Sequence, residues 1–339
     1  MAARTFEKRR VGRTDLEVTT LGLGAASLAG IFTGVSPEQA RATVTHALDA
    51  GITYVDTAPQ YGLGSSEHLV GDVLRERREG VVLSSKVGRL LKPVKSADQD
   101  KGNWIDPLPF NQAYDYSYDG VMRSFEDSQQ RLGLERIDIL YVHDIGTATH
   151  GVDANKPLWQ QLSGGGYRAL RELREAGVVK AIGLGVNEWQ VLMDSFALGD
   201  WDVFLLAGRY TLLEQTSLDP LLTTCVSRGT SVVVGGPFNS GVLVGGDKFN
   251  YAKAPEEIVA KVRALEAVCR EFDVPLPAAA LQFPLTHPAV CNVLPGPRSP
   301  QELDGILDWW DVAVPDELWT AMAAKGLLAP GTPIPGGTA

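Results

Sequence analysis

The sequence predicts an α/β fold, a (β/α)8 TIM barrel, from two observations. Eight short apolar runs alternate with segments whose apolar residues recur at helical spacing. The runs contain few polar residues, which is typical of parallel strands buried on both faces, and parallel strands need crossover helices. A doubly wound sheet is the alternative, but it usually opens with a G-x-G-x-x-G turn. The first turn here, GLGAASLAG, does not have that spacing.

The expected elements follow one another along 339 residues, a length within the range of one such barrel. The strands are expected at 18–24, 52–58, 81–87, 137–143, 178–186, 202–208, 230–236 and 290–296. The first helix has Ser36 as its N-cap, Pro37 at its first position and Gly51 beyond its end. Apolar stripes predict the other helices around 69–74, 121–132, 170–173, 191–196, 218–226, 258–272 and 303–307.

Three segments depart from the minimal barrel pattern. Residues 6–19 predict a β-hairpin with Gly-Arg-Thr-Asp as its turn, placed to plug the bottom of the barrel. Residues 88–117 form a long insertion after the third strand and predict a lid. The tail at 326–339 is rich in Gly and Pro, so we expect it to be mobile. Since no linker divides the chain, we expect one domain over 1–339, with the barrel at about 8–310.

Composition and charge exclude several classes of function. A formal net charge of −10 does not favour nucleic acid or an anionic membrane surface, because both need clustered Lys and Arg. No stretch reaches the length of about 18 apolar residues that a membrane span needs. Residues 1–10 lack the apolar core of a signal peptide, and the three cysteines are odd in number and far apart. We therefore expect a cytoplasmic protein with reduced cysteines.

Four polar residues follow successive apolar runs. Asp56 ends the second strand with Tyr61 just beyond it, Lys86 lies at the end of the third, and His143 ends the fourth. Each alone has an ordinary structural explanation, such as a cap or a buried core histidine. In a barrel, however, the carboxyl ends of the strands carry the active site. We therefore expect the four side chains to meet there.

Together these residues predict proton transfer at a carbonyl or hydroxyl group. The pKa of a free tyrosine is about 10, and a nearby ammonium lowers it. Lys86 supplies that ammonium, Asp56 holds it, and His143 donates a hydrogen bond to the substrate oxygen. This machinery has no electron sink, so a redox reaction needs a cofactor.

The motif D-T-A-x-x-Y-G, the following Lys and the following His resemble the aldo-keto reductase family. The resemblance spans about residues 8–310 and includes GITYVDTAPQYG, SSEHLVGDVL and LPGPRSPQEL. It implies a barrel that binds NAD(P) in extended form without a Rossmann fold. It also implies a catalytic tetrad of Asp56, Tyr61, Lys86 and His143.

The resemblance also implies a cofactor site. Asn187 matches the residue that holds the nicotinamide carboxamide and Tyr210 the aromatic ring that stacks on nicotinamide, while Ala207 stands where the family usually has Gln. The loop at 235–243 matches the pyrophosphate segment, with Gly236, Pro237, Phe238, Ser240 and Gly241. The segment at 296–303 matches the adenosine end, with Gly296, Arg298, Ser299 and Glu302. Acidic Glu302 and Asp304 favour NAD over NADP, although Arg298 is a good phosphate partner, so NADP stays possible.

Several phrases, among them DPLPF and AGRYTLLEQ, are similar to a narrower group in that family. The group comprises D-threo-aldose 1-dehydrogenases (L-fucose dehydrogenases), pyridoxal 4-dehydrogenases and plant L-galactose dehydrogenases. It implies oxidation of a neutral cyclic hemiacetal to a lactone, with an aldose first and pyridoxal as the alternative. The candidate substrate wall is aromatic: Phe32, Trp104, Tyr116 and Trp189.

Two alternatives from other classes stay open. One is a metal-dependent barrel hydrolase with His143, Asp144, Asp56 and His68 as ligands, although His68 falls inside a helix stripe. The other is a non-enzymatic partner protein that senses the cofactor. The intact tetrad favours an enzyme without a metal, and a homo-oligomer is possible.

Overall fold

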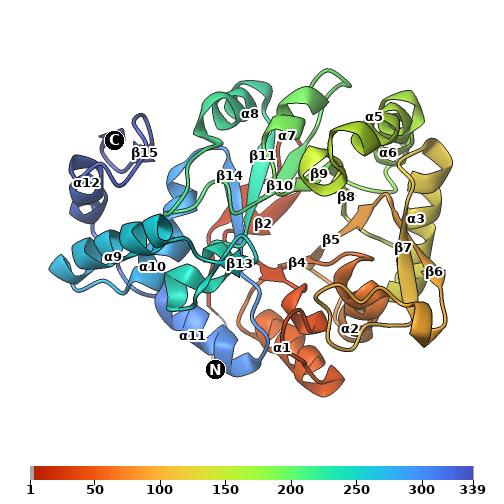
Figure 1. The fold of residues 1–339 in the computed structure, drawn as a ribbon, viewed down its shortest axis with the longest axis horizontal. Helices are drawn as coiled ribbons and strands as arrows, with labels where there is room; N and C mark the ends of the chain where they lie inside the picture. The colour runs from red at the N-terminus through yellow and green to blue at the C-terminus, as the bar shows by residue number, and fades with distance from the viewer. Residues whose placement is uncertain (1–3, 339) are drawn as a thin grey trace.

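The computed structural model describes residues 4–338, in which eight parallel strands form a nearly closed barrel (Figure 1). The strands pair in the order β14-β11-β10-β9-β8-β5-β4-β3, and a parallel bridge from Leu21 to Val293 brings the two ends of the sheet together. The predicted (β/α)8 barrel is therefore confirmed. The strands are β3 (Leu23–Gly24), β4 (Tyr54–Asp56), β5 (Val82–Val87), β8 (Ile139–His143), β9 (Ala181–Val186), β10 (Val203–Ala207), β11 (Ser231–Gly235) and β14 (Val290–Leu294).

Helices surround this sheet, as crossovers between parallel strands require. The first is capped as expected, because the Ser36 hydroxyl accepts a hydrogen bond from the Gln39 backbone N–H. After β8 the chain forms a group of short helices rather than one. The helices are α1 (Pro37–Asp49), α2 (Ser65–Leu74), α3 (Tyr118–Leu132), α4 (Thr147–His150), α5 (Val152–Gln161), α6 (Tyr167–Glu175), α7 (Gln190–Ser195), α8 (Thr223–Arg228), α9 (Glu256–Glu271), α10 (Leu276–Gln282), α11 (Pro300–Trp310) and α12 (Asp316–Ala324).

A β-hairpin covers the amino-terminal end of the barrel, as the sequence predicts. It consists of β1 (Lys8–Arg10) and β2 (Glu17–Thr19), paired antiparallel. Val11 and Val18 are fully buried and pack against the first residues of several barrel strands. The expected first strand at 18–24 is thus split, because its first residues pair within the hairpin, whereas Leu23–Gly24 and the bridging residue Leu21 join the barrel.

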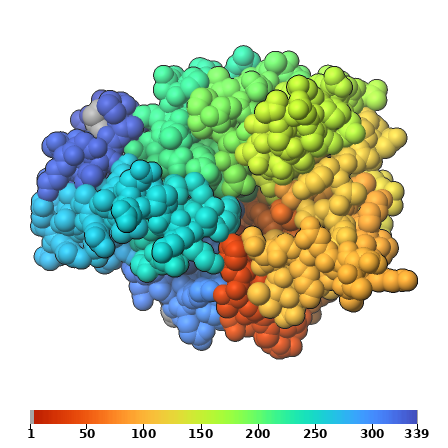
Figure 2. Space-filling model, in the orientation of Figure 1, coloured from red at the N-terminus to blue at the C-terminus, as the bar shows by residue number. Residues whose placement is uncertain are grey.

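The insertion after β5 is an ordered hairpin rather than a plain loop. Strands β6 (Arg89–Pro93) and β7 (Phe110–Tyr114) pair antiparallel at the carboxyl end of the barrel. A second small hairpin, β12 (Lys248–Phe249) with β13 (Ala252–Lys253), lies at the same end. Figure 2 shows a hollow on this face between the teal segment that contains β12–β13 and the orange segment that contains β6–β7. The two hairpins thus border the opening of the barrel.

The carboxyl-terminal segment is more ordered than its composition predicts. Strands β15 (Pro333–Ile334) and β16 (Gly337–Thr338) form a hairpin, and Leu328 and Thr332 are buried. The Thr332 hydroxyl donates a hydrogen bond to the Ala329 carbonyl, and the Gln215 side chain accepts one from the Ala329 N–H. Residues 326–338 thus have defined secondary structure, and the bond between Ala329 and Gln215 joins them to the segment after β10; their mobility stays a prediction. No helix among residues 4–338 is long and apolar enough to cross a membrane.

Candidate active site

The four predicted tetrad residues meet at the carboxyl end of the barrel. Asp56 ends β4, Lys86 is the next-to-last residue of β5, and His143 ends β8. Tyr61 begins a 3-10 turn, Tyr61–Gly64, which bends the chain back over the strand ends before α2. The structure brings all four together because neighbouring parallel strands end at the same edge of the sheet.

Asp56 and Lys86 form a buried ion pair. The Lys86 ammonium donates hydrogen bonds to both Asp56 oxygens, at 2.8 and 2.6 Å, and to the Thr57 carbonyl at 2.9 Å. The Ser84 hydroxyl donates a further bond to Asp56 at 2.6 Å. Burial lowers the pKa of Lys86 and raises that of Asp56, and the attraction between the two charges opposes both shifts. Every donor of Lys86 is thus engaged, and its charge is neutralised locally.

Tyr61 lies against this pair, but its acidity differs from the expectation. The Lys86 nitrogen is 4.7 Å from the centre of the Tyr61 ring. Burial raises the pKa of Tyr61 well above 10, and the carboxylates of Asp56 and Asp144 raise it further. The expected lowering by Lys86 is wrong, because Asp56 cancels the charge that would have stabilised the phenolate. Tyr61 therefore keeps its proton at neutral pH.

His143 faces Tyr61 as a neutral ring. The two ring centres are 5.9 Å apart and the rings are nearly perpendicular. Burial lowers the pKa of His143 well below 6.5, and the charges of Arg89 and Lys86 lower it further. Its buried Nδ1 has no hydrogen-bond partner among the described residues. A neutral imidazole that carries its proton on Nε2 can donate a hydrogen bond to a substrate oxygen.

The structure adds a group that the sequence analysis did not place in this site. Asp144, considered there only as a metal ligand, forms a salt bridge with Arg89, and its oxygen lies 3.6 Å from the His143 Nε2. Arg89, the first residue of β6, is almost fully buried and donates a second bond to Gln112 on β7 at 2.8 Å. The signal available in the sequence was the charge itself, since Arg89 and Asp144 each lie two residues beyond the last apolar residue of a strand, Val87 and Val142.

The loop after β11 fits an extended dinucleotide. Gly236 and Gly241 have φ of 60° and 102°, and a Cβ on either would meet no atom within 4 Å, so open space lies beside them. Asn239 and Ser240 are also left-handed, and the buried Asn239 Oδ1 has no partner among the described residues. Such turns expose backbone amides that bind phosphate oxygens. Within this loop Phe238 packs against Trp309, with ring centres 5.8 Å apart, while Pro237 precedes it.

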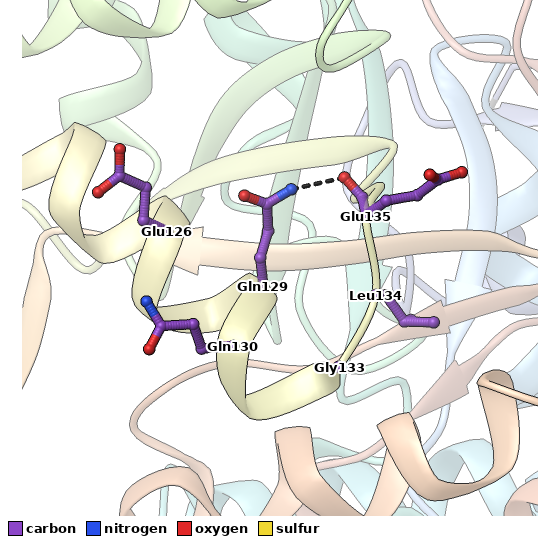
Figure 3. A pocket seen from close by; sticks show the side chains of 6 residues that line it. All are labelled: Glu126, Gln129, Gln130, Gly133, Leu134 and Glu135. Atoms are coloured by element: carbon purple, nitrogen blue, oxygen red, sulfur yellow. Dashed lines mark hydrogen bonds between the residues drawn. The ribbon is translucent and has the colours of Figure 1, made fainter.

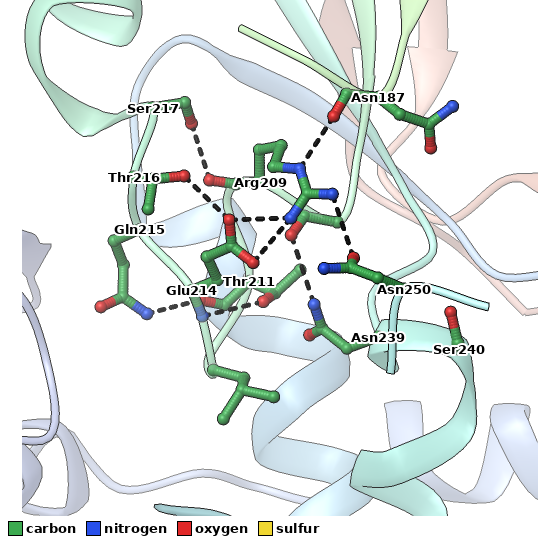
Figure 4. Close-up of polar contacts among 12 residues, drawn as sticks. Asn187, Arg209, Thr211, Glu214, Gln215, Thr216, Ser217, Asn239, Ser240 and Asn250 are labelled. Atoms are coloured by element: carbon green, nitrogen blue, oxygen red, sulfur yellow. Dashed lines mark hydrogen bonds and ion pairs between the residues drawn. The ribbon is translucent and has the colours of Figure 1, made fainter. Parts of the chain in front are cut away.

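Arg209 links the segments on one side of the opening (Figure 4). Its guanidinium donates to the Asn187 carbonyl at 2.8 Å, to both Glu214 oxygens at 2.9 Å and to the Asn250 side chain at 3.0 Å. Asn187 follows β9, and its side-chain amide donates to Asp144 at 3.2 Å. Asn187 thus lies next to Asp144, the neighbour of His143, and its role as carboxamide ligand stays a prediction.

Tyr210 does not present a free face to a ligand. Its side chain is fully buried, and its ring packs against Phe283 and His287 with ring centres 5.5 and 5.4 Å apart. The expected stacking of Tyr210 on a nicotinamide ring is therefore corrected for this conformation. The reason is that Tyr210 follows β10 into the core, whereas the adjacent Arg209 points toward the opening.

At the expected adenosine end, Arg298 and Glu302 are bound to each other. The Glu302 carboxylate accepts hydrogen bonds from the Arg298 backbone N–H at 2.9 Å and from its guanidinium at 2.6 and 2.9 Å. Burial opposes ionisation of Glu302, but the hydrogen bonds from Arg298 outweigh it and lower its pKa. Ser299 is the N-cap of α11, and a Cβ at Gly296 would lie 2.8 Å from the Ser27 hydroxyl. Glu302 is therefore not a free carboxylate, as the sequence analysis assumed.

The predicted aromatic wall is only partly present. Trp104 lies with its ring centre 6.1 Å from that of Tyr61, and half-buried Phe32 lies 6.4 Å from Tyr251 on the turn between β12 and β13. Trp189 is half-buried beside Asn187, at the start of α7. Tyr116 is corrected: it is fully buried, and its hydroxyl donates to the His143 carbonyl at 2.7 Å, so it supports the strand end instead of contacting substrate. Tyr251 is an addition to the wall.

Two other features lie away from this site. A shallow surface hollow is lined by Glu126, Gln129, Gln130, Gly133, Leu134 and Glu135 (Figure 3). It lies on the loop that enters β8, at the amino-terminal end of the barrel. His68, one of the four ligands of the metal-site alternative, is exposed on α2. Asp56 meanwhile binds Lys86, so the structure does not assemble that set of ligands.

Comparison with known proteins defines the class to which the chain belongs. The model of the aldo/keto reductase family matches residues 20–326. The chain belongs to this family, and it is an NAD(P)-dependent oxidoreductase.

Relatives and solved structures agree with this assignment. The chain is 48% identical to pyridoxal 4-dehydrogenase from Microbacterium luteolum, over 97% of this chain and 100% of that protein. It is 36% identical to D-threo-aldose 1-dehydrogenase from a Pseudomonas species, over 92% of this chain and 95% of that protein. The structure resembles an aldo-keto reductase from Bacillus halodurans with a TM-score of 0.73 and 25% identity, over 96% and 97% of the two chains.

Proposed function

We propose that the protein oxidises a cyclic hemiacetal to its lactone, with Tyr61 as the acid–base group. The observation that carries this proposal is the cluster at the strand ends: the Tyr61 ring lies 4.7 Å from the Lys86 nitrogen and 5.9 Å from the His143 ring. The ionised fraction of Tyr61, which is small at neutral pH and grows as the pH rises, takes the proton of the anomeric hydroxyl. His143 orients that oxygen. The nicotinamide cofactor, when bound, accepts the hydride from the anomeric carbon.

We assign to the cofactor residues that surround the opening. Asn187 lies beside the tetrad, and the loop at Gly236–Gly241 has open space beside its two glycines. NAD is the proposed cofactor, because Glu302 occupies the guanidinium of Arg298, the group that a 2′-phosphate would need. The 2′-phosphate of NADP would have to compete with the Glu302 carboxylate for the Arg298 guanidinium.

Two substrates fit the proposal, an aldose such as L-fucose and pyridoxal, which also closes to a hemiacetal. From the sequence, an aldose is the first expectation. The identity of 48% with a pyridoxal 4-dehydrogenase, against 36% with a D-threo-aldose 1-dehydrogenase, favours pyridoxal and 4-pyridoxolactone as product. Both substrates are neutral and small, which is consistent with the half-buried aromatic residues at the opening.

The test is an initial-rate screen of L-fucose, L-galactose, D-arabinose and pyridoxal with NAD and with NADP. We expect turnover with at least one hemiacetal, and NMR of the first products should show lactone before free acid. Free acid that forms first, faster than the lactone hydrolyses, would mean that an aldehyde hydrate is oxidised instead. No turnover with any pair, in protein that binds the cofactor, would favour the non-enzymatic, cofactor-sensing alternative.

A further inference from the structure

Asp144 lies beside His143 because the chain turns sharply between them. In an extended strand, consecutive side chains point to opposite faces of the sheet. Asp144 instead has φ of 46°, a left-handed conformation that Asp tolerates better than most residues. Its carboxylate therefore returns to the same side as the imidazole, with Oδ2 3.6 Å from the His143 Nε2.

Two partners fix the orientation of this carboxylate. Arg89 donates to Oδ2, and the Asn187 side chain donates to Oδ1 at 3.2 Å. The Arg89 side chain is 3% exposed and that of Asp144 is 12% exposed, so the pair is largely removed from water. A buried carboxylate stays charged when a partner of opposite charge binds it. The hairpin β6–β7 supplies that partner, because Arg89 is held in turn by Gln112.

The carboxylate has capacity for another donor. An ionised carboxylate accepts at about four lone-pair positions and donates none. Arg89 and Asn187 occupy one position on each oxygen. Its Oδ2 lies 3.6 Å from the His143 Nε2, and the His143 ring centre lies 5.9 Å from that of Tyr61, so the carboxylate is close to the reaction centre. A donor at His143 and an acceptor at Asp144 therefore stand side by side next to Tyr61.

We propose that Asp144 determines substrate specificity by accepting a hydrogen bond from a substrate hydroxyl close to the reacting carbon. The inference rests on the proposed function and names the substrate class of that site. While His143 binds the reacting oxygen, the neighbouring hydroxyl donates to Asp144. In an aldose this is the C2 hydroxyl, and in pyridoxal it is the ring hydroxyl. A bound substrate without that hydroxyl excludes water from the carboxylate of Asp144 but donates no hydrogen bond to it. It therefore leaves a buried acceptor unpaired.

The experiment measures kcat/KM for two matched pairs of substrates: L-fucose with its 2-deoxy analogue, and pyridoxal with its 3-deoxy analogue. Since hydrogen bonds to charged groups are the stronger ones, we expect the wild type to prefer the hydroxylated compound by about 10- to 100-fold. In Asp144→Asn the preference for the hydroxylated compound should fall below about fivefold, because the amide is uncharged and its NH2 group donates hydrogen bonds instead of accepting them.

The matched control is Glu188→Gln, a carboxylate at the same end of the barrel. Glu188 accepts hydrogen bonds from the Ala148 N–H and the Thr147 hydroxyl, and we expect this variant to keep the wild-type preference. Equal kcat/KM for hydroxylated and deoxy compounds in the wild type would overturn the inference without any variant. Equal loss on both compounds in Asp144→Asn would also overturn it, since Asp144 would then only position His143. Absence of turnover with every compound would instead overturn the proposed function and this inference with it.

Discussion

Replacing Lys86 with methionine should destabilise the protein strongly, because it leaves a buried carboxylate without its counter-charge. Both side chains of the Asp56–Lys86 pair are at most 2% exposed, and Lys86 donates to three oxygens. Breaking a buried pair by removing one partner costs about 3–5 kcal/mol. With an unfolding entropy of roughly 2.1 cal/mol/K per residue over 339 residues, the melting temperature should fall by about 4–7 °C.

Guanidinium chloride unfolding at pH 7 measures this loss, and two further variants make the result specific. Lys156→Met breaks an exposed pair with Asp153, whose side chains are 67% and 96% exposed, and should cost less than about 1 kcal/mol. The double variant Asp56→Asn with Lys86→Met removes both charges, so it should be more stable than Lys86→Met alone. A loss below about 1 kcal/mol in Lys86→Met, or a double variant no more stable than Lys86→Met alone, would refute the reasoning.

Three other perturbations test the site and its surroundings. Tyr61→Phe should lower kcat by about 10²–10⁴-fold with cofactor binding retained. Because the pKa of Tyr61 is raised, the rate of oxidation by the wild type should still increase above about pH 8. A rate that stops increasing below that pH would contradict the assignment of Tyr61 as the base. Glu302→Gln removes the charge that holds the guanidinium of Arg298, so kcat/KM with NADP should improve relative to NAD. An unchanged ratio of the two kcat/KM values would show that this pair does not determine the choice of cofactor. Burial lowers the pKa of His287 from 6.5 to about 4, so the unfolded state binds more protons below pH 6.5. The free energy of unfolding should therefore fall between pH 6.5 and 4, and more weakly in His287→Asn; an identical slope in the variant would contradict this.

The barrel was predictable because its signals are local. Near-continuous apolar runs, the Ser36 cap and the spacing of the helices each depend on neighbouring residues, and the strand ends then place Asp56, Lys86 and His143 at one edge. The start of the first strand was harder, since Val18 and Thr19 fall in both the expected hairpin and the expected strand, and they pair with the hairpin. Pairing is a non-local choice that an apolar pattern does not decide.

The state of the site residues depended on contacts that no short pattern contains. Tyr61 has the ammonium of Lys86 nearby, as expected, yet its pKa is raised because burial and Asp56 outweigh that charge. Tyr210 and Tyr116 lie at the expected places along the chain, but both side chains are fully buried. Arg298 and Glu302 are four residues apart and bind each other. The sequence prediction took the two charges separately, with Arg298 favouring NADP and Glu302 favouring NAD.

The hairpin after β5 has a consequence for the exchange of loops between related enzymes. Gly88, just before it, has φ of 97°, and a Cβ there would lie 2.2 Å from the ring of Tyr116, just after it. That ring carries the hydroxyl that supports the carbonyl of His143, while Arg89 at the start of the hairpin binds Asp144. A graft of the insertion from another aldo-keto reductase would therefore change the contacts that support His143 and Asp144 at the end of β8, as well as the residues that border the opening of the barrel. Recombination should succeed only when the insertion and the His143–Asp144 strand end are transferred from the same parent.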